Sequence, residues 1–327
     1  MEFILHVGLP KTGSTSLQAA LNVNRETLRR QGVIYPAIGI SGLRRIKHSA
    51  LGKVLTGVAP SRVGMSEDWY EKFNSEIAGA DICILSNENF AGSKKLEVLA
   101  SMFPRSRIRV VMYVREPVAY AVSRYRQGVK DGNRTMSLRD FAQYYTPPFY
   151  SAAKRMADFY GKENVVIRLN ERDGDQWDIV SDFANLIGLE LNDTFLRNNF
   201  EKNPGIAGNL LFVKRVMNCF FTHEEFFLLI REDMRKLPYL DSSFRGNIPV
   251  DQGTVELIAN RSRESLECLD RHFQIKVSVR EKPIEAPPSP DYCSLGRDFA
   301  RILASVRERD DRLAALLEHM AGIFALD

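Results

Sequence analysis

The sequence has few cysteines, a small net charge and no long hydrophobic run. The cysteines, Cys83, Cys219, Cys268 and Cys293, are scattered without the spacing of metal ligands. This pattern argues against a disulfide framework and favours a reducing compartment, with Cys83 in an apolar strand of the core. The formal net charge of +4 over 327 residues does not indicate a nucleic-acid-binding protein, although it suits an anionic ligand.

No segment approaches the run of about 20 apolar residues that a membrane-spanning helix requires. The apolar stretch near the start, Phe3 to Leu5, is shorter than a signal peptide and leads directly into a polar loop. We therefore expect a soluble, cytoplasmic protein that at most binds peripherally to the inner face of a membrane. A chain that has lost a membrane anchor is the alternative.

Apolar segments alternate with segments of helical periodicity over the first two thirds of the chain. The predicted strands are 2–7, 81–86, 108–114 and 164–169, and the predicted helices are 14–31, 66–79, 94–102, 117–130, 149–161, 175–188, 206–221, 223–236 and 252–273. This alternation predicts an α/β fold with a doubly wound parallel sheet and a helical C-terminal half. In such folds ligands bind beyond the carboxyl ends of the strands.

The C-terminal part has a different composition. Residues 281–293 form a proline-rich linker, so we expect a domain over 1–280 and a separate helix over 294–327. In segment 294–327, apolar side chains recur at alternating spacings of four and three residues, and Arg309 interrupts the pattern. The positions are Leu295, Phe299, Ile302, Val306, Arg309, Leu313, Leu316, Met320 and Ile323. The heptad period predicts a coiled coil and a homo-oligomer. The alternative is an amphipathic helix that folds back onto its own domain. A membrane-surface helix is less favoured because its charges are mixed.

The first strand leads into a loop that is rich in glycine, lysine and hydroxyl groups, and a helix follows. The loop, residues 7–16, contains Gly8, Lys11 and Gly13. A strand, a glycine-rich turn and a helix N-terminus together form a phosphate site, because backbone N–H groups converge there. The lysine adds a positive charge and the hydroxyls can donate hydrogen bonds.

The order of residues within loop 7–16 distinguishes it from an NTP-binding P-loop. Gly8 and Gly13 have the P-loop spacing, but Ser14 stands where the P-loop lysine belongs, and the lysine is Lys11. Pro-Lys-Thr-Gly-Ser-Thr resembles the 5′-phosphosulfate loop of sulfotransferases that use 3′-phosphoadenosine 5′-phosphosulfate (PAPS). The alternative is a kinase or NTPase with a variant loop. Such an enzyme also needs an acidic magnesium ligand after a later strand, and the sequence offers no convincing one.

A second segment resembles another motif of the same family. Arg115 ends the predicted strand 108–114, Pro117 suits the first turn of a helix, and Ser123 lies about two turns into that helix. The order strand, Arg-x-Pro, helix and serine is similar to the 3′-phosphate motif of PAPS-dependent sulfotransferases. Taken alone, Arg115 is more typical of a surface arginine.

The resemblance implies roles for individual residues. Lys11 would stabilise charge on the leaving phosphate, and Arg115 and Ser123 would bind the 3′-phosphate of the donor. The donor is PAPS, the product is adenosine 3′,5′-bisphosphate, and no metal is required. The 5′-phosphate would be held by Lys11, Thr12, Gly13, Ser14, Thr15 and Ser16.

Transfer to a hydroxyl needs a general base, and two residues are candidates. Glu88 follows the strand 81–86 in a Ser-x-Glu segment like those of carbohydrate sulfotransferases. A loop carboxylate or helix cap is its alternative role. His48 follows the basic residues Arg44, Arg45 and Lys47, which would suit an acidic acceptor, and a solvated basic loop is its alternative. His6 is expected to be structural, although it could touch loop 7–16.

One family feature is absent from the sequence. Cytosolic small-molecule sulfotransferases close the donor site with an Arg-Lys-Gly-x-x-Gly segment. Here the nearest substitute is the polar segment 202–209, a candidate lid that is somewhat more typical of an ordinary interhelical loop. This favours the carbohydrate-type or bacterial branch, with a saccharide, glycolipid or small metabolite as acceptor and no nucleic acid. The non-enzymatic alternative is a coiled-coil scaffold with a vestigial nucleotide fold.

Overall fold

The protein was analysed as a computed structural model, which describes residues 1–9, 11–42, 45–88, 90, 93–102, 107–170, 177–196, 205–220, 237–308 and 311–324. The chain forms two compact units. The first unit contains Met1–Glu116, Pro148–Lys202 and Glu264–Val277. The second unit contains Pro117–Pro147, Asn203–Arg263 and Ser278–Asp327.

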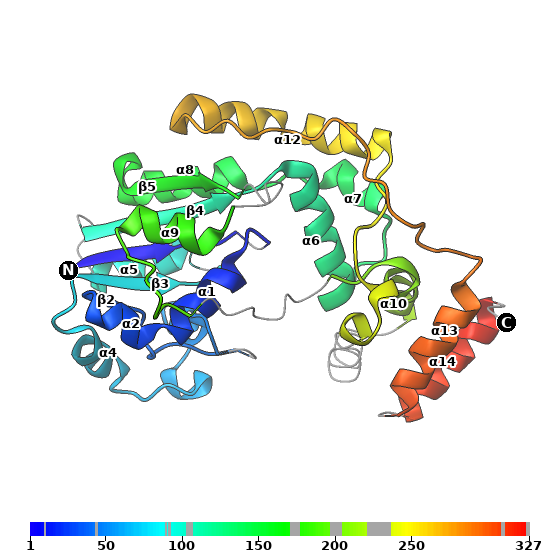
Figure 1. Ribbon diagram of the computed structural model, residues 1–327, viewed down its shortest axis with the longest axis horizontal. Coiled ribbons are helices and arrows are strands. Elements are labelled where there is room, and N and C mark those ends of the chain that lie inside the picture. The colour runs from blue at the N-terminus through cyan, green and yellow to red at the C-terminus, as the bar shows by residue number, and fades with distance from the viewer. Residues whose placement is uncertain are drawn as a thin grey trace. The chain divides into compact units, whose positions relative to one another are not determined.

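The first unit contains a five-stranded, fully parallel sheet (Figure 1). Its strands are β1 (Glu2–His6), β2 (Val33–Ile34), β3 (Ile82–Ser86), β4 (Ile108–Val114) and β5 (Val165–Leu169). The predicted α/β class and parallel sheet are confirmed, and all four predicted strands are present. β2 was missed because two residues carry no detectable alternation.

The strand order is β2-β3-β1-β4-β5, so β1 lies at the centre. From β1 the chain continues to β2 and β3 on one side, and then crosses to β4 and β5 on the other. β1 and β4 are parallel neighbours, and in their register Phe3 lies opposite Ile108 and His6 lies opposite Val111. The direction of winding therefore reverses between β1 and β4, which is where ligands bind in doubly wound sheets.

One face of the sheet is covered by α1 (Ser14–Val23), α2 (Arg25–Arg30) and α9 (Ile179–Ile187), which share a buried cluster with the strands. The predicted single helix 14–31 is wrong, because it is divided at Asn24. The Asn24 side chain donates to the carbonyls of Ala20 and Leu196 and accepts from the Leu196 N–H. A side chain that bonds to nearby backbone competes with helix continuation, which explains the break.

The first unit has further helices at α3 (Ser49–Val54), α4 (Trp69–Ile77), α5 (Ser93–Met102) and α8 (Phe149–Tyr160). Short 3₁₀ turns are Pro60–Val63 and Lys162–Asn164. α8 packs on β4 and β5. The long helix α12 (Gln252–Phe273) contributes residues to both units and matches its predicted bounds.

The second unit is helical and has its own buried cluster. It contains α6 (Pro117–Asp131), α7 (Leu138–Tyr144), α10 (Gly208–Phe220), a 3₁₀ turn at Ser242–Phe244, α13 (Leu295–Arg307) and α14 (Asp311–Phe324). α10 packs on both α6 and α13. The predicted helix 223–236 lies outside the described residues.

The C-terminal segment forms two helices, so the predicted single heptad helix over 294–327 is wrong. α13 ends at Arg307, and α14 begins at Asp311 and packs back on α13 (Figure 1). Phe299, Ile302 and Leu313 of the heptad pattern are buried in the core of the second unit. This is the fold-back arrangement that the sequence left as the alternative, although Leu316 of the pattern is exposed. Arg309 lies outside the described residues.

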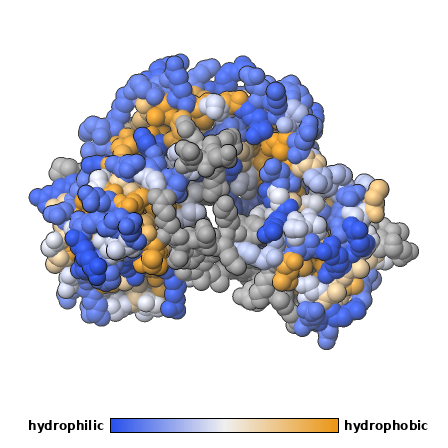
Figure 2. Space-filling view, viewed as in Figure 1, coloured by the Kyte–Doolittle hydropathy of each residue, from blue (hydrophilic) through white to orange (hydrophobic). Residues whose placement is uncertain are grey.

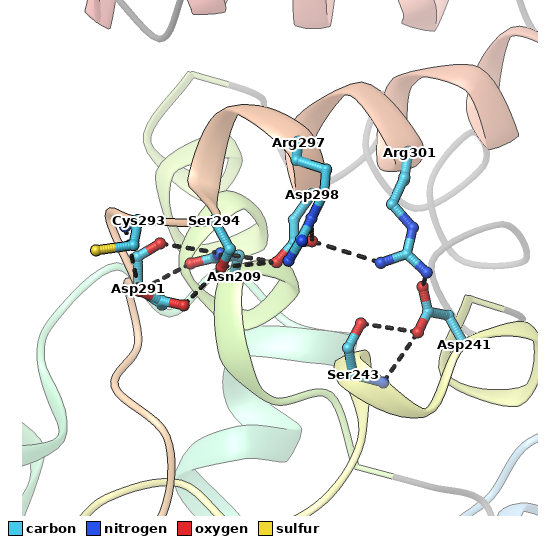
Figure 3. A network of polar contacts seen from close by, with 9 residues as sticks. All are labelled: Asn209, Asp241, Ser243, Asp291, Cys293, Ser294, Arg297, Asp298 and Arg301. Atoms are coloured by element: carbon cyan, nitrogen blue, oxygen red, sulfur yellow. Dashed lines mark hydrogen bonds and ion pairs between the residues drawn. The ribbon is translucent and has the colours of Figure 1, made fainter.

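A polar network fastens α13 to α10 within the second unit (Figure 3). Asn209, at the start of α10, is buried and donates to the Asp291 carbonyl, the Ser294 hydroxyl and Asp298 Oδ2. Its own oxygen accepts the Asp291 N–H at 2.8 Å. Arg301 forms ion pairs with Asp298 and Asp241. Because the buried amide is fully bonded, the network fixes how α13 sits on α10.

The surface is mainly hydrophilic on the face drawn in Figure 2, with hydrophobic residues in separate small groups. Tyr144, Leu240 and Tyr292 are the most exposed large hydrophobic residues among those described. In the described part of the chain, no helix combines the length and the apolarity needed to cross a membrane.

Lys214 of α10 is buried in the second unit, and this leads to a pH-dependent prediction. Its Nζ donates to Asn218 Oδ1 at 2.6 Å, and burial lowers its pKa from 10.5 to about 7, a shift that Asp131 opposes. Between these two pKa values the unfolded chain binds more protons, so stability rises with pH.

We expect the wild-type protein to gain about 2 kcal/mol of unfolding free energy relative to Lys214→Met between pH 7 and pH 9. Denaturant titrations of both proteins at both pH values measure this difference. Parallel pH dependences would contradict the prediction.

Candidate active site

Loop 7–16 leaves the carboxyl end of β1 in a tight turn. The Val7 N–H donates to the Val111 carbonyl at 2.9 Å, which extends the pairing of β1 with β4 by one residue. The Thr12 hydroxyl and N–H both donate to the Leu9 carbonyl, at 2.7 and 3.3 Å. A Cβ on Gly8 would lie 2.2 Å from Ser14 Oγ, so glycine is required at this position.

The end of the turn uses two residues in the left-handed region. Lys11 has φ +74° and Gly13 has φ +93°. Gly13 is the N-cap of α1 and has no side chain to cap it, and the first turn carries no acidic residue. Thr15 and Ser16 are exposed, and the Ser16 N–H donates to the Gly13 carbonyl at 3.0 Å. The N-terminal end of α1 therefore presents N–H and hydroxyl groups near the surface.

Ser14 is the strongest sign of a ligand at this helix. Its Oγ is buried and has no hydrogen-bond partner among the described residues. Buried hydroxyls are normally bonded, so an acceptor at the N-terminus of α1 would complete this one. Together with the half-buried Lys11 ahead of it, the site fits the terminal oxygens of a phosphate or sulfate group.

Asn170, the residue after β5, supports loop 7–16 and was not identified from the sequence. Its N–H donates to the Val114 carbonyl at 2.7 Å, and its Nδ2 donates to the Thr12 carbonyl at 2.6 Å. Its Oδ1 is buried without a partner among the described residues. Asn170 thus joins the ends of β4 and β5 to the loop. Its place directly after the predicted strand 164–169 was the available signal.

The two residues predicted for a 3′-phosphate lie in different units. Arg115 follows β4, the neighbour of β1, and is half-buried in the first unit. Ser123 is half-buried on α6 of the second unit. α6 begins at Pro117, as the sequence predicted. Their joint action on one phosphate stays a prediction.

Glu88 lies at the same sheet edge as loop 7–16, because β3 is the other neighbour of β1. Its side chain is 21% exposed, and Oε2 lies 3.7 Å from Lys47 Nζ. A partly accessible carboxylate at this edge can receive a proton from a bound acceptor. Its role as base stays a prediction.

His48 is fully buried, so the alternative of a solvated loop residue is wrong. Its Nδ1 accepts the Ser86 N–H and its Nε2 contacts the Pro36 carbonyl, both at 3.1 Å. The Asn87 side chain donates to the His48 carbonyl at 2.9 Å. Burial lowers the pKa of His48 to about 4. With both ring nitrogens engaged, His48 holds the segment before α3 against β3, and we retain Glu88 as the base candidate.

His6 is also buried and forms part of the floor beneath loop 7–16. Its Nδ1 lies 2.7 Å from Ser86 Oγ, which also accepts from Gln18 Nε2 at 3.0 Å. Its Cε1 is 3.4 Å from where a Cβ on Gly8 would be. Burial lowers the pKa of His6 to about 4. Its expected structural role follows, because the ring links β1, β3 and α1.

Some predicted features can be described only in part. Arg44 and residues 202–204 lie outside the described residues. Arg45 is exposed with φ +45°, and an isolated bridge joins Ser41 to Lys47. Among the described residues, no group of three or more histidine, cysteine, aspartate or glutamate side chains could hold a metal ion.

Comparisons with known proteins give a limited result. Neither a protein-family model nor a curated protein matches the chain. Among solved structures, it is similar to a sulfotransferase from Alicyclobacillus acidocaldarius, with 16% identity, a TM-score of 0.46, and coverage of 85% of this chain and 97% of that one. It is also similar to a sulfotransferase domain from the curacin biosynthetic pathway, with 14% identity, a TM-score of 0.34, and coverage of 59% and 75%. At these identities, the function of this chain has to be inferred from its own residues.

Proposed function

We propose that the protein is a PAPS-dependent sulfotransferase that transfers a sulfuryl group to an acceptor hydroxyl. The observation that carries the proposal is the buried hydroxyl of Ser14 at the N-terminus of α1, which has no hydrogen-bond partner in the described part of the chain. It follows a turn in which Lys11 precedes the second glycine. This order resembles the sulfotransferase loop and differs from that of NTP-binding P-loops.

In this proposal, loop 7–16 binds the 5′-phosphosulfate end of the donor. The N–H groups of residues 13–15 and the hydroxyls of Ser14 and Thr15 hold the 5′-phosphate, because the N–H groups of Thr12 and Ser16 already donate within the loop. Lys11 stabilises the charge that builds on the leaving phosphate oxygen. Arg115 and Ser123 bind the 3′-phosphate, which distinguishes this donor from ATP.

The reaction is an in-line displacement at sulfur. The acceptor oxygen forms a bond to sulfur while the bond from sulfur to the 5′-phosphate oxygen breaks, releasing adenosine 3′,5′-bisphosphate. Glu88 takes the proton of the acceptor hydroxyl. The protein contributes alignment of the two substrates and stabilisation of charge.

We infer a saccharide, glycolipid or small metabolite as the acceptor, by analogy with carbohydrate sulfotransferases. A homo-oligomer and a cytoplasmic location stay predictions. The variant-loop kinase or NTPase stays the competing enzyme, and a non-catalytic scaffold stays the competing non-enzyme. The scaffold has less support, because Phe299, Ile302 and Leu313 of the heptad pattern pack within the chain, although Leu316 is exposed.

Calorimetric titration tests the proposal. We expect adenosine 3′,5′-bisphosphate to bind without metal, and Arg115→Ala to weaken this binding by about tenfold or more because a charge-assisted contact is lost. ATP with magnesium is titrated in parallel.

Binding of ATP with magnesium in preference to the bisphosphate would establish the kinase alternative. Binding of neither nucleotide would favour the scaffold.

A further inference from the structure

Arg126 lies on α6 one turn after Ser123, and both are half-buried in the second unit. Residues three apart on a helix share a face, so the guanidinium and the Ser123 hydroxyl emerge on the same side of α6. Arg126 belongs to neither of the two phosphate motifs of the sequence. Its surroundings point to a role.

The guanidinium of Arg126 packs on the backbone that leads into α10. Its Nε donates to the Ile206 carbonyl at 2.9 Å. A Cβ on Gly205 would lie 2.4 Å from Nη2 and 2.6 Å from Cζ, so the group lies directly against the glycine. One edge of the guanidinium is thereby held in place, and its remaining N–H groups, which form a fixed fork, donate to no other residue that the structure describes.

The charge of Arg126 lacks a carboxylate partner among the described residues, none of which forms an ion pair with it. Other arginines of this unit do have one: Arg139 lies 3.4 Å from Asp251, and Arg301 pairs with Asp241. Burial lowers the pKa of Arg126 to about 10, and no described charge opposes the shift. Burying a cation without a counter-charge destabilises the folded protein, and a bound anion would offset this free-energy cost.

We infer that Arg126 is an anion-binding residue that acts with Ser123 on the 3′-phosphate of the donor nucleotide. The inference rests on the proposed function and adds a residue to it. A phosphate fits because its oxygens accept the parallel N–H groups of a guanidinium together with a serine hydroxyl.

The test compares two nucleotides that differ only in the 3′-phosphate, adenosine 3′,5′-bisphosphate and AMP. We expect Arg126→Gln to weaken binding of the bisphosphate by about tenfold or more and to leave AMP binding nearly unchanged. Arg126→Lys keeps the charge but loses the fork, so an intermediate loss is expected. Calorimetry measures the affinity of each variant for both nucleotides. If Arg126→Gln does not fold, Arg126→Lys tests the inference in its place.

Arg124→Gln is the matched control, because Arg124 is on the same helix and its Nη1 donates to Gln127 Oε1. Its selectivity for the bisphosphate should equal that of the wild type. Equal weakening of both nucleotides by Arg126→Gln would overturn the inference and leave Arg126 as support for Gly205. If the wild type binds neither nucleotide, the proposed function fails first, which is a distinguishable result.

Discussion

Lys11→Ala should lower kcat by about two to three orders of magnitude while the protein stays folded. The lysine is the only proposed group that stabilises charge as it builds on the leaving phosphate, and loss of one such group costs a rate factor of this size. Alanine experiences the same backbone strain as lysine at φ +74°, so the turn need not change. Steady-state sulfation assays with PAPS and a screened hydroxyl acceptor measure kcat.

The control for this variant is Lys53→Ala, which removes an exposed lysine of α3. It should retain wild-type turnover. Adenosine 3′,5′-bisphosphate should bind to Lys11→Ala with a smaller loss than the loss in kcat, since the charge acts mainly in the transition state. Full turnover by Lys11→Ala would remove its proposed role at the leaving group.

Glu88→Gln should lower kcat by about two to four orders of magnitude with a hydroxyl acceptor, because the amide cannot accept the proton. The replacement is nearly isosteric, so the position of the side chain opposite Lys47 should persist. Donor affinity should stay near the wild-type value, which separates this effect from that of loop 7–16.

Glu67→Gln, at an exposed loop position, provides a carboxylate control that should leave kcat unchanged. If Glu88→Gln turned over as fast as the wild type, another group would have to be the base. His48 would be a poor substitute, since its ring is buried and both nitrogens are engaged.

Much of the fold could be predicted because the sheet is buried on both faces. β4 (Ile108–Val114) reads as an apolar run apart from Arg109, and a buried parallel strand needs such a run. α12 keeps one helical period over its whole length and its bounds were predicted correctly. The division at Asn24 could not be predicted, because it depends on a bond to Leu196, far along the chain.

The C-terminal heptads show a different limit. A repeat at spacings of three and four specifies an apolar stripe but not the surface that covers it. The heptad pattern predicts that the stripe packs against a second copy of the chain. In the structure, Phe299 and Val306 pack in the core of the second unit of the same chain. The break between Arg307 and Asp311 carries no glycine or proline that would have revealed it.

The candidate site was predictable where its groups come from one short segment. Gly8, Lys11 and Gly13 lie within six residues, and local spacing alone indicates a phosphate turn. Asn170 and the buried position of His48 depend on strands that are distant in sequence. Sheet order brings them to the loop edge, and a single sequence does not report sheet order.

The left-handed conformation of Lys11 has a consequence for how this loop evolves. A non-glycine residue in that region costs on the order of 1 kcal/mol, which glycine would recover. Selection for folding alone would therefore place glycine at position 11, and only selection for chemistry retains a lysine there. Position 11 is thus a place where stability and activity oppose each other, and a stabilised lineage that lost the lysine would have kept the fold and abandoned the reaction.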